Sequence, residues 1–280
     1  MEPKIAITGA NGFVGLSLRR FLNNNDISTV SLTRKKIRLS KLDKCVVFSD
    51  LDQHNIARKL QGCSAFVHLI GTGMQTKDVD YASVNVELTK KAIALCKKAQ
   101  IRKFVYISGL GVKQNTTFGY FISKLRAEQQ IVNSGLNYTI LRASYIIGNR
   151  DPMTKNLKRQ MTKGRILVPG SGAYRLQPVS VDDACKVIFE ATTRPRMSNK
   201  IVDLVGPRTI SFLSFVKKFA KNTKIVKLDL EQAYSDALNF PKKATYSLDD
   251  LNILVGDFVG DYKKLERLCG FRLKTPDEFL

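Results

Sequence analysis

The stretch Lys4-Ile5-Ala6-Ile7-Thr8-Gly9-Ala10-Asn11-Gly12-Phe13-Val14-Gly15 decides the fold of this 280-residue chain. A short apolar run, typical of a strand, ends in a Gly-x-x-Gly-x-x-Gly loop, and residues 16–24 then have the pattern of a helix. Gly9 permits a sharp turn, Gly12 lets the backbone approach a pyrophosphate, and Gly15 lets the helix pack close to the strand. We therefore expect dinucleotide phosphates at the helix N-terminus, where free N–H groups favour negative charge; the alternative is a glycine-rich surface turn.

Segments that favour strands and helices alternate through the first two-thirds of the chain. The predicted strands are residues 5–8, 28–33, 45–48, 65–70, 103–108, 138–142 and 201–204, and the predicted helices between them are residues 16–24, 56–60, 81–99, 119–133 and 182–192. The strands are nearly continuous apolar runs, as expected when helices cover both faces of a parallel sheet. The pattern predicts an α/β fold with a Rossmann-type doubly wound parallel sheet and ligands beyond the carboxyl ends of its strands.

The alternation loosens from about Asn149 onward. We expect residues 1–150 to form a dinucleotide-binding Rossmann core. Residues 151–280 are predicted to be a mixed region, in which about 176–205 completes the core and the remainder forms a small C-terminal cap for a substrate or partner. Helices are expected in this part at residues 211–220, 230–237, 247–254 and 262–268, with Ser211 and Ser247 as N-caps.

The composition is that of a globular protein, with 44% hydrophobic and 25% charged residues. No apolar run reaches the roughly 18 residues of a transmembrane helix, and a strand follows Met1 almost at once, so we expect neither a membrane span nor a signal peptide. The five cysteines are scattered without a Cys-x-x-Cys pair, which indicates reduced thiols and a cytoplasmic location. Because His54 and His68 are the only histidines, we predict no metal site and no Ser-His-Asp triad; Asp182-Asp183 is interpreted as an N-terminal helix cap.

The formal net charge of +22 favours acidic partners. No aromatic residues interleave with the basic clusters, so we expect no nucleic-acid partner. Two interpretations stay open: the charge is a lysine-rich solvated surface, or it serves an acidic protein or a membrane surface to which the protein is peripheral.

Tyr120 and Lys124 lie four residues apart at the start of a predicted helix that follows the strand ending at Ser108. Residues at this spacing share one helical face. A nearby ammonium group stabilises a phenolate and lowers the tyrosine pKa from about 10 toward working pH. Tyr120 is therefore a candidate acid or base for moving a hydroxyl proton during hydride transfer, although a lysine-rich chain also produces this spacing by chance.

The turn after the second predicted strand points to the choice of cofactor. Thr33 is followed by Arg34-Lys35-Lys36, without the acidic residue that usually binds the adenosine 2′-hydroxyl of NAD. Arg34 could hold a 2′-phosphate in a forked contact, with Lys35 or Lys36 as a second charge. We expect NADP(H) to be preferred over NAD(H); the alternative is a solvated basic turn.

The order and spacing of these motifs resemble the short-chain dehydrogenase/reductase superfamily, in its extended or atypical branch of NAD-dependent epimerase/dehydratase-like proteins. The matching pieces are Thr8 to Gly15, Asn85-Val86, Phe104-Val105-Tyr106-Ile107-Ser108, Tyr120 to Lys124, Leu141-Arg142 and Pro178-Val179-Ser180-Val181-Asp182-Asp183. The resemblance covers essentially the whole chain. The tail, from Leu248 to Pro276, is most similar to the subgroup that includes the NADPH-binding accessory subunit of respiratory complex I.

This resemblance implies roles for individual residues. Tyr120 would be the catalytic tyrosine, Lys124 would hold the nicotinamide ribose and depress the tyrosine pKa, and Ser108 would lie near the nicotinamide. Together with the glycine loop and the basic turn, the expected cofactor-binding residues are Gly9, Asn11, Gly12, Phe13, Val14, Gly15, Thr33, Arg34, Lys35, Asp50, Leu51, Leu69, Ile70, Gly71, Ile107, Ser108, Tyr120, Lys124, Ala143 and Ser144.

Two departures from the family pattern leave two functions open. Gly109 stands where related enzymes usually carry a second Ser or Thr for the substrate oxygen, and the segment from Ser108 to Tyr120 is short compared with sugar-nucleotide epimerases. The first hypothesis is an NADP(H)-dependent oxidoreductase or epimerase/dehydratase acting on a hydroxyl or carbonyl of a small substrate. A phosphorylated substrate such as a sugar nucleotide would suit the basic residues Lys155, Lys158, Arg159 and Arg175. The alternative is a non-catalytic NADP(H)-binding accessory or assembly subunit.

Overall fold

The computed structural model describes residues 3–220 and 222–280, and within them seven parallel strands form one sheet in the order β11-β6-β5-β4-β1-β2-β3. These strands are β1 (Lys4–Thr8), β2 (Ser28–Thr33), β3 (Asp43–Val47), β4 (Ala65–His68), β5 (Lys103–Gly109), β6 (Asn137–Ala143) and β11 (Lys200–Leu204). The order reverses between β1 and β4, the point at which the crevice of a doubly wound sheet opens. The predicted Rossmann-type fold is confirmed.

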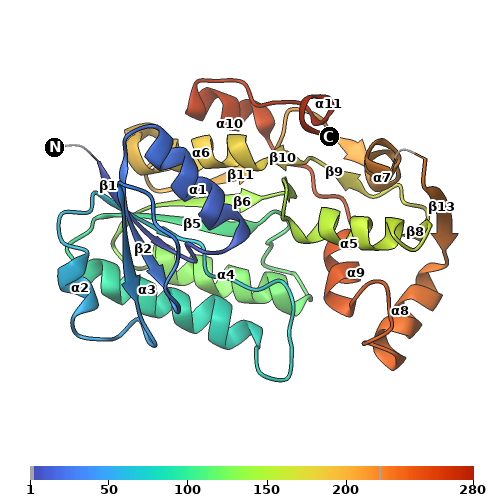
Figure 1. The fold of residues 1–280 in the computed structure, drawn as a ribbon, viewed down its shortest axis with the longest axis horizontal. Coiled ribbons are helices and arrows are strands. Elements are labelled where there is room, and N and C mark those ends of the chain that lie inside the picture. Colours follow the sequence, from blue (N-terminus) through green and yellow to red (C-terminus); the bar gives the residue numbers. More distant parts are fainter. Residues whose placement is uncertain (1–2, 221) are drawn as a thin grey trace.

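Helices cover both faces of this sheet (Figure 1). On one face α1 (Phe13–Asn24) packs beside α6 (Val181–Thr193). The other face carries α2 (Ile56–Lys59), α3 (Leu88–Lys98) and α4 (Gly119–Val132). Because each central strand is buried on both sides, its sequence is apolar throughout rather than alternating.

The cap lies beyond the carboxyl ends of the strands, at the right of Figure 1, around its own buried core. Its elements and the connections to it are β7 (Ile146–Ile147), α5 (Pro152–Met161), β8 (Arg165–Pro169), β9 (Arg175–Leu176), β10 (Val179–Ser180), β12 (Ile210–Ser211), α7 (Phe212–Ala220), β13 (Lys224–Leu228), α8 (Leu230–Asn239) and α9 (Leu248–Leu254). A 3-10 turn (Pro195–Met197), α10 (Tyr262–Cys269) and α11 (Pro276–Phe279) complete the chain. None of the helices in residues 3–220 and 222–280 is both long and apolar enough to span a bilayer.

The tail helix α10 was expected in the cap, and that expectation is wrong. Leu265 and Cys269, four residues apart on one face, are buried in the core that they share with α1, α6 and the sheet, and α10 packs against β11. An i, i+4 apolar pair identifies the buried face of a helix but not the surface that covers it. The tail therefore returns from the cap to the Rossmann core.

Three local details also differ from the sequence predictions. The segment predicted as one helix over residues 81–99 begins as a π-helix (Ala82–Glu87) before α3. Helix α5 was not predicted, although Asp151 caps it and Pro152 occupies its first turn. The N-cap of α6 is Ser180, whose hydroxyl accepts from the Asp183 N–H, so the aspartates lie in the first turn. Ser247 caps α9 as predicted, in a capping box.

A buried ion pair joins α1 to the start of β3. The Arg19 Nε donates to Asp43 Oδ2 at 2.7 Å, and the Asp43 side chain is fully buried. Its other oxygen accepts from the hydroxyls of Thr29 at 2.9 Å and Ser31 at 2.8 Å, both on β2. Asp43 thus satisfies the guanidinium that α1 brings to the sheet. Removing one partner of such a pair leaves an uncompensated buried charge.

We predict that Asp43→Ala lowers the free energy of unfolding by about 3–5 kcal/mol, because the Arg19 guanidinium would remain buried without its carboxylate. Urea denaturation followed by circular dichroism measures the loss. The matched control is Asp52→Ala, which removes an exposed partner of Lys91 and should cost less than about 1 kcal/mol. Equal losses for the two variants would contradict the assignment.

Candidate functional site

The glycine loop presents an uncapped helix terminus at the carboxyl edge of β1. Gly9 has φ +67°, and a Cβ at Gly15 would lie 2.2 Å from the Gly9 carbonyl oxygen, so only glycine allows α1 to sit this close. Gly12 is the N-cap of α1, and no side chain among the described residues caps that end. Within the same residues, helices α2, α3 and α4 also lack a side-chain cap, whereas side chains cap α5, α6, α8, α9 and α10. The free N–H groups of α1 therefore fit an anionic ligand such as a pyrophosphate.

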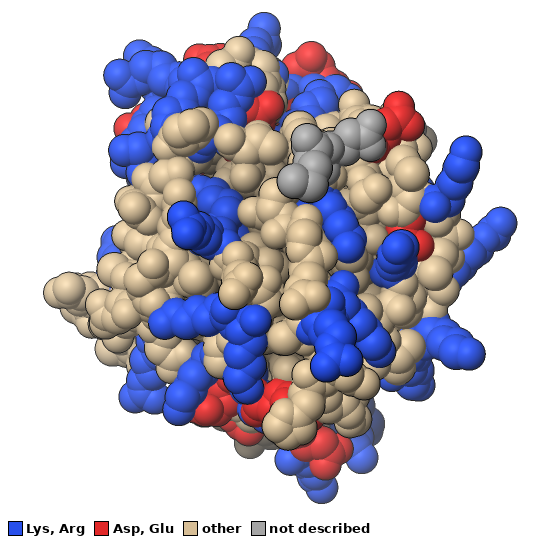
Figure 2. All heavy atoms as spheres, turned by 90° about the vertical axis from the view of Figure 1, so that its left-hand side faces the viewer, with Lys and Arg blue, Asp and Glu red and all other residues tan. Residues whose placement is uncertain are grey.

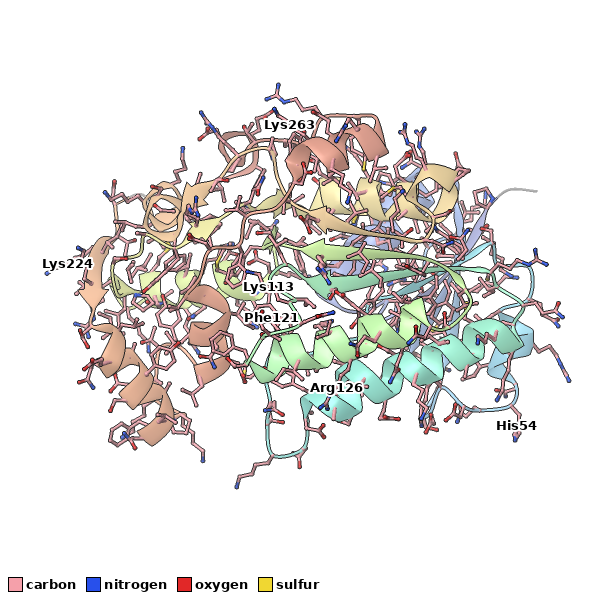
Figure 3. All side chains as sticks on the ribbon, turned by 180° about the vertical axis from the view of Figure 1, so that it is seen from behind. His54, Lys113, Phe121, Arg126, Lys224 and Lys263 are labelled. Carbon is pink, nitrogen blue, oxygen red and sulfur yellow. The ribbon has the colours of Figure 1, made fainter. Side chains whose placement is uncertain are left out.

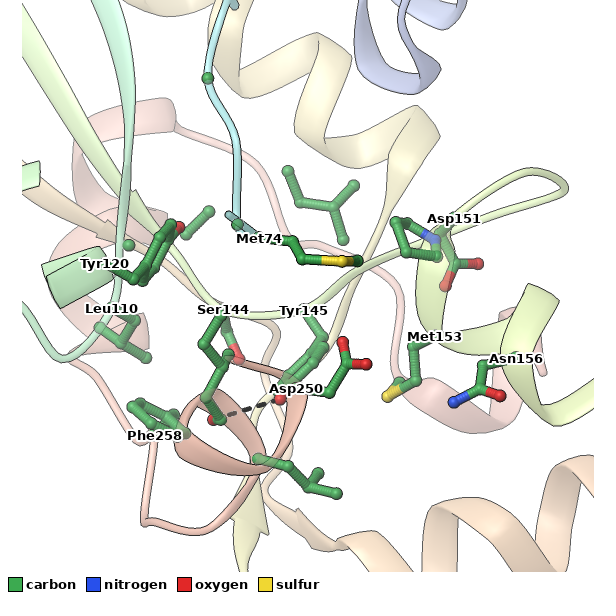
Figure 4. Close-up of a pocket in the computed structure, with 18 of the residues that line it drawn as sticks. Met74, Leu110, Tyr120, Ser144, Tyr145, Asp151, Met153, Asn156, Asp250 and Phe258 are labelled. Atoms are coloured by element: carbon green, nitrogen blue, oxygen red, sulfur yellow. Dashed lines mark hydrogen bonds between the residues drawn. The ribbon is translucent and has the colours of Figure 1, made fainter. Parts of the chain in front are cut away.

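A cleft of about 940 Å³ lies between the carboxyl edge of the sheet and the cap. It brings together seven of the predicted site residues: Gly71, Ile107, Ser108, Tyr120, Lys124, Ala143 and Ser144. The cap side is formed by residues that sequence reasoning missed, among them Tyr145, Asp250 and Phe258 (Figure 4). The Tyr145 hydroxyl donates to the Ile253 carbonyl at 3.3 Å, which connects the segment after β6 to α9. The fold thus creates a cleft that contains the predicted Tyr–Lys pair.

The other predicted cofactor residues follow β1 to β4 along the same edge but do not line this cleft. They are Gly9, Asn11, Gly12, Phe13, Val14, Gly15, Thr33, Arg34, Lys35, Asp50, Leu51, Leu69 and Ile70. The Asp50 carboxylate pairs with Lys91 at 2.6 Å, which lowers its pKa, and the Leu51 side chain is buried in the core. The Thr33 hydroxyl donates to the Lys35 carbonyl at 2.7 Å, while the side chains of Arg34 and Lys35 are exposed.

The buried Lys124 ammonium is held by the sheet. Its Nζ donates to the Tyr106 hydroxyl at 3.1 Å and to the Ile107 carbonyl at 3.2 Å. The third N–H of an ammonium remains for a ligand. Gly71 keeps that approach open, because a Cβ there would lie 3.0 Å from Nζ. Burial lowers the pKa of Lys124 to about 8.

The expected lowering of the Tyr120 pKa is wrong for the structure as it stands. Burial raises the pKa of Tyr120 to about 12. The Lys124 Nζ lies 6.0 Å from the centroid of the Tyr120 ring and donates to Tyr106 and Ile107 instead. Sequence spacing places both side chains on one helical face, but it does not show which acceptor the ammonium reaches.

Asn85 in the π-helix organises the mouth of the site. Its side-chain oxygen accepts from the Thr72 N–H at 2.9 Å, and its amide donates to the Thr72 carbonyl at 3.0 Å and to the Ser123 hydroxyl at 3.0 Å. Ser123 in turn donates to the Tyr120 carbonyl at 2.7 Å. Asn85 therefore fixes the loop after β4 relative to the first turn of α4. π-Helical turns often occur at functional sites for this kind of positioning.

Ser108 and Gly109 end β5 beside Tyr120. The Ser108 hydroxyl is buried and has no hydrogen-bond partner in the described part of the chain. Such an orphaned group in a cleft fits a ligand oxygen. A Cβ at Gly109 would lie 3.1 Å from both Cε1 and Oη of Tyr120. The glycine at this position gives the tyrosine ring its space, which is a physical reason for the departure seen in the sequence.

Neither histidine belongs to the cleft. His68 is fully buried, its Nδ1 shares a 2.8 Å hydrogen bond with the Thr8 hydroxyl, and burial lowers its pKa to about 3. His54 lies at the exposed surface before α2, well away from the cleft-lining Phe121 (Figure 3). Among residues 3–220 and 222–280, no three His, Cys, Asp or Glu side chains are grouped to hold a metal ion.

Two of the four basic residues expected near the substrate line the cleft. Lys155 and Arg159 project from α5 into its wall. Lys158 is exposed outside the lining, and Arg175 pairs with Asp257 at 2.8 Å, so the expectation is wrong for these two. Lys155 and Arg159 are four residues apart and share one face of α5.

Comparison with known proteins places these features in a family. A model described as NAD(P)H-binding matches residues 9–191. An uncharacterized sugar epimerase of Bacillus subtilis, YhfK, is 25% identical over 72% of this chain and 93% of its own length. Subunit 9 of the mouse mitochondrial NADH dehydrogenase [ubiquinone] 1 alpha subcomplex is 24% identical over 59% of this chain, which spans 44% of that protein.

A solved structure supports the same architecture. MoeE5 in complex with UDP-glucuronic acid and NAD superimposes with a TM-score of 0.77 over 97% of this chain and 94% of the other, at 17% sequence identity. This likeness shows the fold. The match covers the cap as well as the Rossmann core.

The depressed Lys124 pKa predicts a pH-dependent stability. A lysine with a folded pKa of about 8 and an unfolded value of about 10.4 binds fewer protons when folded between these values, so stability rises with pH across that window. From pH 7 to pH 10, wild type should gain about 2 kcal/mol relative to Lys124→Met. Urea titrations at each pH measure this difference. Lys98→Met, at an exposed position, should run parallel to wild type. If the stability of Lys124→Met and of wild type changed with pH in the same way, the lowered pKa of Lys124 would be refuted.

Proposed function

The chain belongs to the NAD(P)H-binding family, and we propose that it is an NADP(H)-dependent oxidoreductase or epimerase/dehydratase acting on a hydroxyl or carbonyl group of a small substrate. The observation that carries the proposal is the convergence of Tyr120, Lys124 and Ser108 on one cleft at the carboxyl edge of the sheet. This edge also carries the uncapped N-terminus of α1. Ligands of doubly wound sheets bind along it.

The residues at this edge fit a nicotinamide dinucleotide. The N–H groups at the start of α1 would hold the pyrophosphate, and Arg34 and Lys35 would hold an adenosine 2′-phosphate. Their side chains form none of the ion pairs made by the described residues, so both charges are available. When bound, the nicotinamide supplies hydride chemistry. NADP(H) is preferred in this proposal because the turn carries cations and no carboxylate.

The chain's own residues supply proton transfer and positioning. The Tyr120 hydroxyl would give its proton to, or take one from, the substrate oxygen. The unpartnered Ser108 hydroxyl would hold that oxygen in place. Lys124, with one N–H left by its two partners in the sheet, would bind ribose hydroxyls next to Gly71. Asn85 holds Thr72 and Ser123 in position beside Lys124 through its side-chain hydrogen bonds.

The cleft supports a phosphorylated substrate. Lys155 and Arg159 line its cap side, opposite the edge that carries Tyr120. Basic side chains recognise phosphate through charge-assisted hydrogen bonds. A sugar nucleotide is the substrate class that this arrangement favours, and it agrees with the names of YhfK and of the MoeE5 complex.

The five cysteines are unpaired thiols, which supports a reducing compartment such as the cytoplasm.

A second candidate function is an accessory subunit that binds NADP(H) without catalysis. The specific observation in its favour is that Lys124 is engaged by Tyr106 and Ile107 while burial raises the Tyr120 pKa. The absent hydroxyl at Gly109 points the same way. Similarity to the mitochondrial NADH dehydrogenase subunit agrees with this role.

Replacing the tyrosine distinguishes the two functions. In an enzyme, Tyr120→Phe should lower the rate of NADPH-dependent carbonyl reduction, or of UDP-sugar epimerisation, by about 10²- to 10⁴-fold, because general acid catalysis is lost. NADPH affinity, measured by nucleotide fluorescence, should stay within about threefold. The matched control is Tyr138→Phe on β6, outside the cleft lining. A wild-type protein that binds NADPH tightly but turns over none of these substrates would favour the accessory function.

The basic turn should determine cofactor preference. Arg34→Ala should weaken NADPH binding by about 10- to 100-fold, because a charge-assisted contact to the 2′-phosphate is lost, and should leave NADH binding unchanged. Competition titrations with both nucleotides measure the ratio. Arg58→Ala, an exposed cation on α2, is the matched control. An equal loss for NADH and NADPH would show that Arg34 does not contact the 2′-phosphate.

A further inference from the structure

A second, smaller cavity of about 280 Å³ opens on the cap, between the C-terminal half of α5, the start of β8 and residues 242–245. Its lining consists of Arg159, Gln160, Lys163, Arg165, Leu167, Lys242, Lys243, Ala244 and Thr245. Five of these nine residues are cations and none is acidic. None of the five takes part in the ion pairs made by the described residues. The cavity is therefore a concentration of uncompensated positive charge.

The floor of this cavity is fixed by buried hydrogen bonds. The side-chain oxygen of Gln160 accepts from the Leu167 N–H at 2.8 Å, and its amide donates to the Tyr246 hydroxyl at 3.3 Å. That hydroxyl donates to the Leu167 carbonyl at 2.6 Å. A hydrogen-bonded floor with cations at its rim suits a compact anion of about the size of a phosphate group.

Two large apolar side chains protrude beside the cavity. Leu238 is 62% exposed and Phe240 is 58% exposed, more than any other large hydrophobic residue that the structure describes. The Phe240 carbonyl accepts from the Lys243 N–H at 2.8 Å and from the Ala244 N–H at 2.9 Å. One tight turn thus joins the apolar tip to the basic rim. The tip stands at the end of α8, at the lower right of Figure 1.

We propose that the α8 tip, defined as Leu238 and Phe240 with the basic cavity beside them, docks onto an anionic phospholipid membrane. The cavity receives a lipid headgroup phosphate, and the two apolar side chains enter the interfacial region of the bilayer. This attachment is peripheral and does not depend on the function proposed for the cleft, although Arg159 lines both the cleft and the cavity. Apolar side chains flanked by cations are the combination that an anionic membrane surface attracts.

Positive charge alone does not distinguish the α8 tip from the rest of the molecular surface. Figure 2 shows Lys and Arg spread over the end of the molecule that lies at the left of Figure 1. The α8 tip differs because its cations border exposed apolar side chains. Asp236 is the acidic residue of α8 closest in sequence to the tip, and its carboxylate accepts from the Gln232 amide at 2.7 Å, whereas Asp229 and Glu231 lie at the opposite end of the helix. A protruding apolar tip beside a pocket also differs from the broad surfaces at which proteins pair.

Vesicle co-sedimentation of the full chain tests the proposal. The probes are vesicles of phosphatidylcholine alone and vesicles containing about 30% phosphatidylserine, at physiological ionic strength. We expect binding to the anionic vesicles, and about tenfold or greater loss of the partition coefficient in both Leu238→Ser/Phe240→Ser and Lys242→Glu/Lys243→Glu.

Matched variants elsewhere separate docking from general attraction. Lys97→Glu/Lys98→Glu changes the charge equally on α3, and Leu39→Ser/Val132→Ser removes exposed apolar side chains elsewhere on the surface. Both should keep vesicle binding within about twofold of wild type. Equal losses for the two charge reversals, or no loss from the α8 apolar pair, would overturn the proposal. So would a protein that binds inorganic phosphate but stays in the supernatant with every vesicle. Thermal unfolding of each variant confirms that the fold is retained.

Discussion

The close approach of α1 to the turn after β1 is the constraint on which the rest of the structure depends. A Cβ at Gly15 would collide with the Gly9 carbonyl at 2.2 Å, and a Cβ at Gly9 would lie 2.9 Å from the Leu69 backbone. The turn is thus pressed between the helix and the segment that follows β4. This packing fixes the uncapped N-terminus of α1 at the place where strand order reverses. Parallel strands then bring their carboxyl ends to the same edge, and the site follows from that geometry.

Lys124 connects this scaffold to the chemistry of the cleft. Its ammonium is buried, and the Tyr106 hydroxyl and the Ile107 carbonyl compensate part of the desolvation. Both acceptors lie on β5, so the strand that supplies Ser108 also positions the lysine. Asn85 adds a second restraint through Ser123, one residue before Lys124. The site is therefore organised by polar groups inside the fold, which a bound nucleotide would meet already in place.

The sequence predicts the central sheet well because its signals are local and strong. Seven apolar runs correspond to seven strands, and the close approach of strand and helix requires the glycines of the loop. The cap is harder to predict because β7, β9, β10 and β12 are two-residue strands whose pairing depends on tertiary contacts. The buried face of α10 is visible in the sequence, but its packing partner is not. For the site, the sequence predicts the residue types and the sheet edge that they share. It does not predict which atoms accept from Lys124, nor that Tyr145 and Phe258 line the cleft, because both depend on tertiary packing.

The raised pKa of Tyr120 bears on the direction of the proposed reaction. With a pKa of about 12, its phenol stays protonated at neutral pH. A protonated phenol can supply the proton that a carbonyl oxygen takes up on reduction, whereas oxidation of a hydroxyl group requires a phenolate to accept one. Burial disfavours that phenolate, and the nearest ammonium is held by Tyr106 and Ile107. In the proposed reaction, the protonated Tyr120 phenol would therefore serve first as the donor of a proton to a carbonyl oxygen, while Lys124 keeps its third N–H for a ligand.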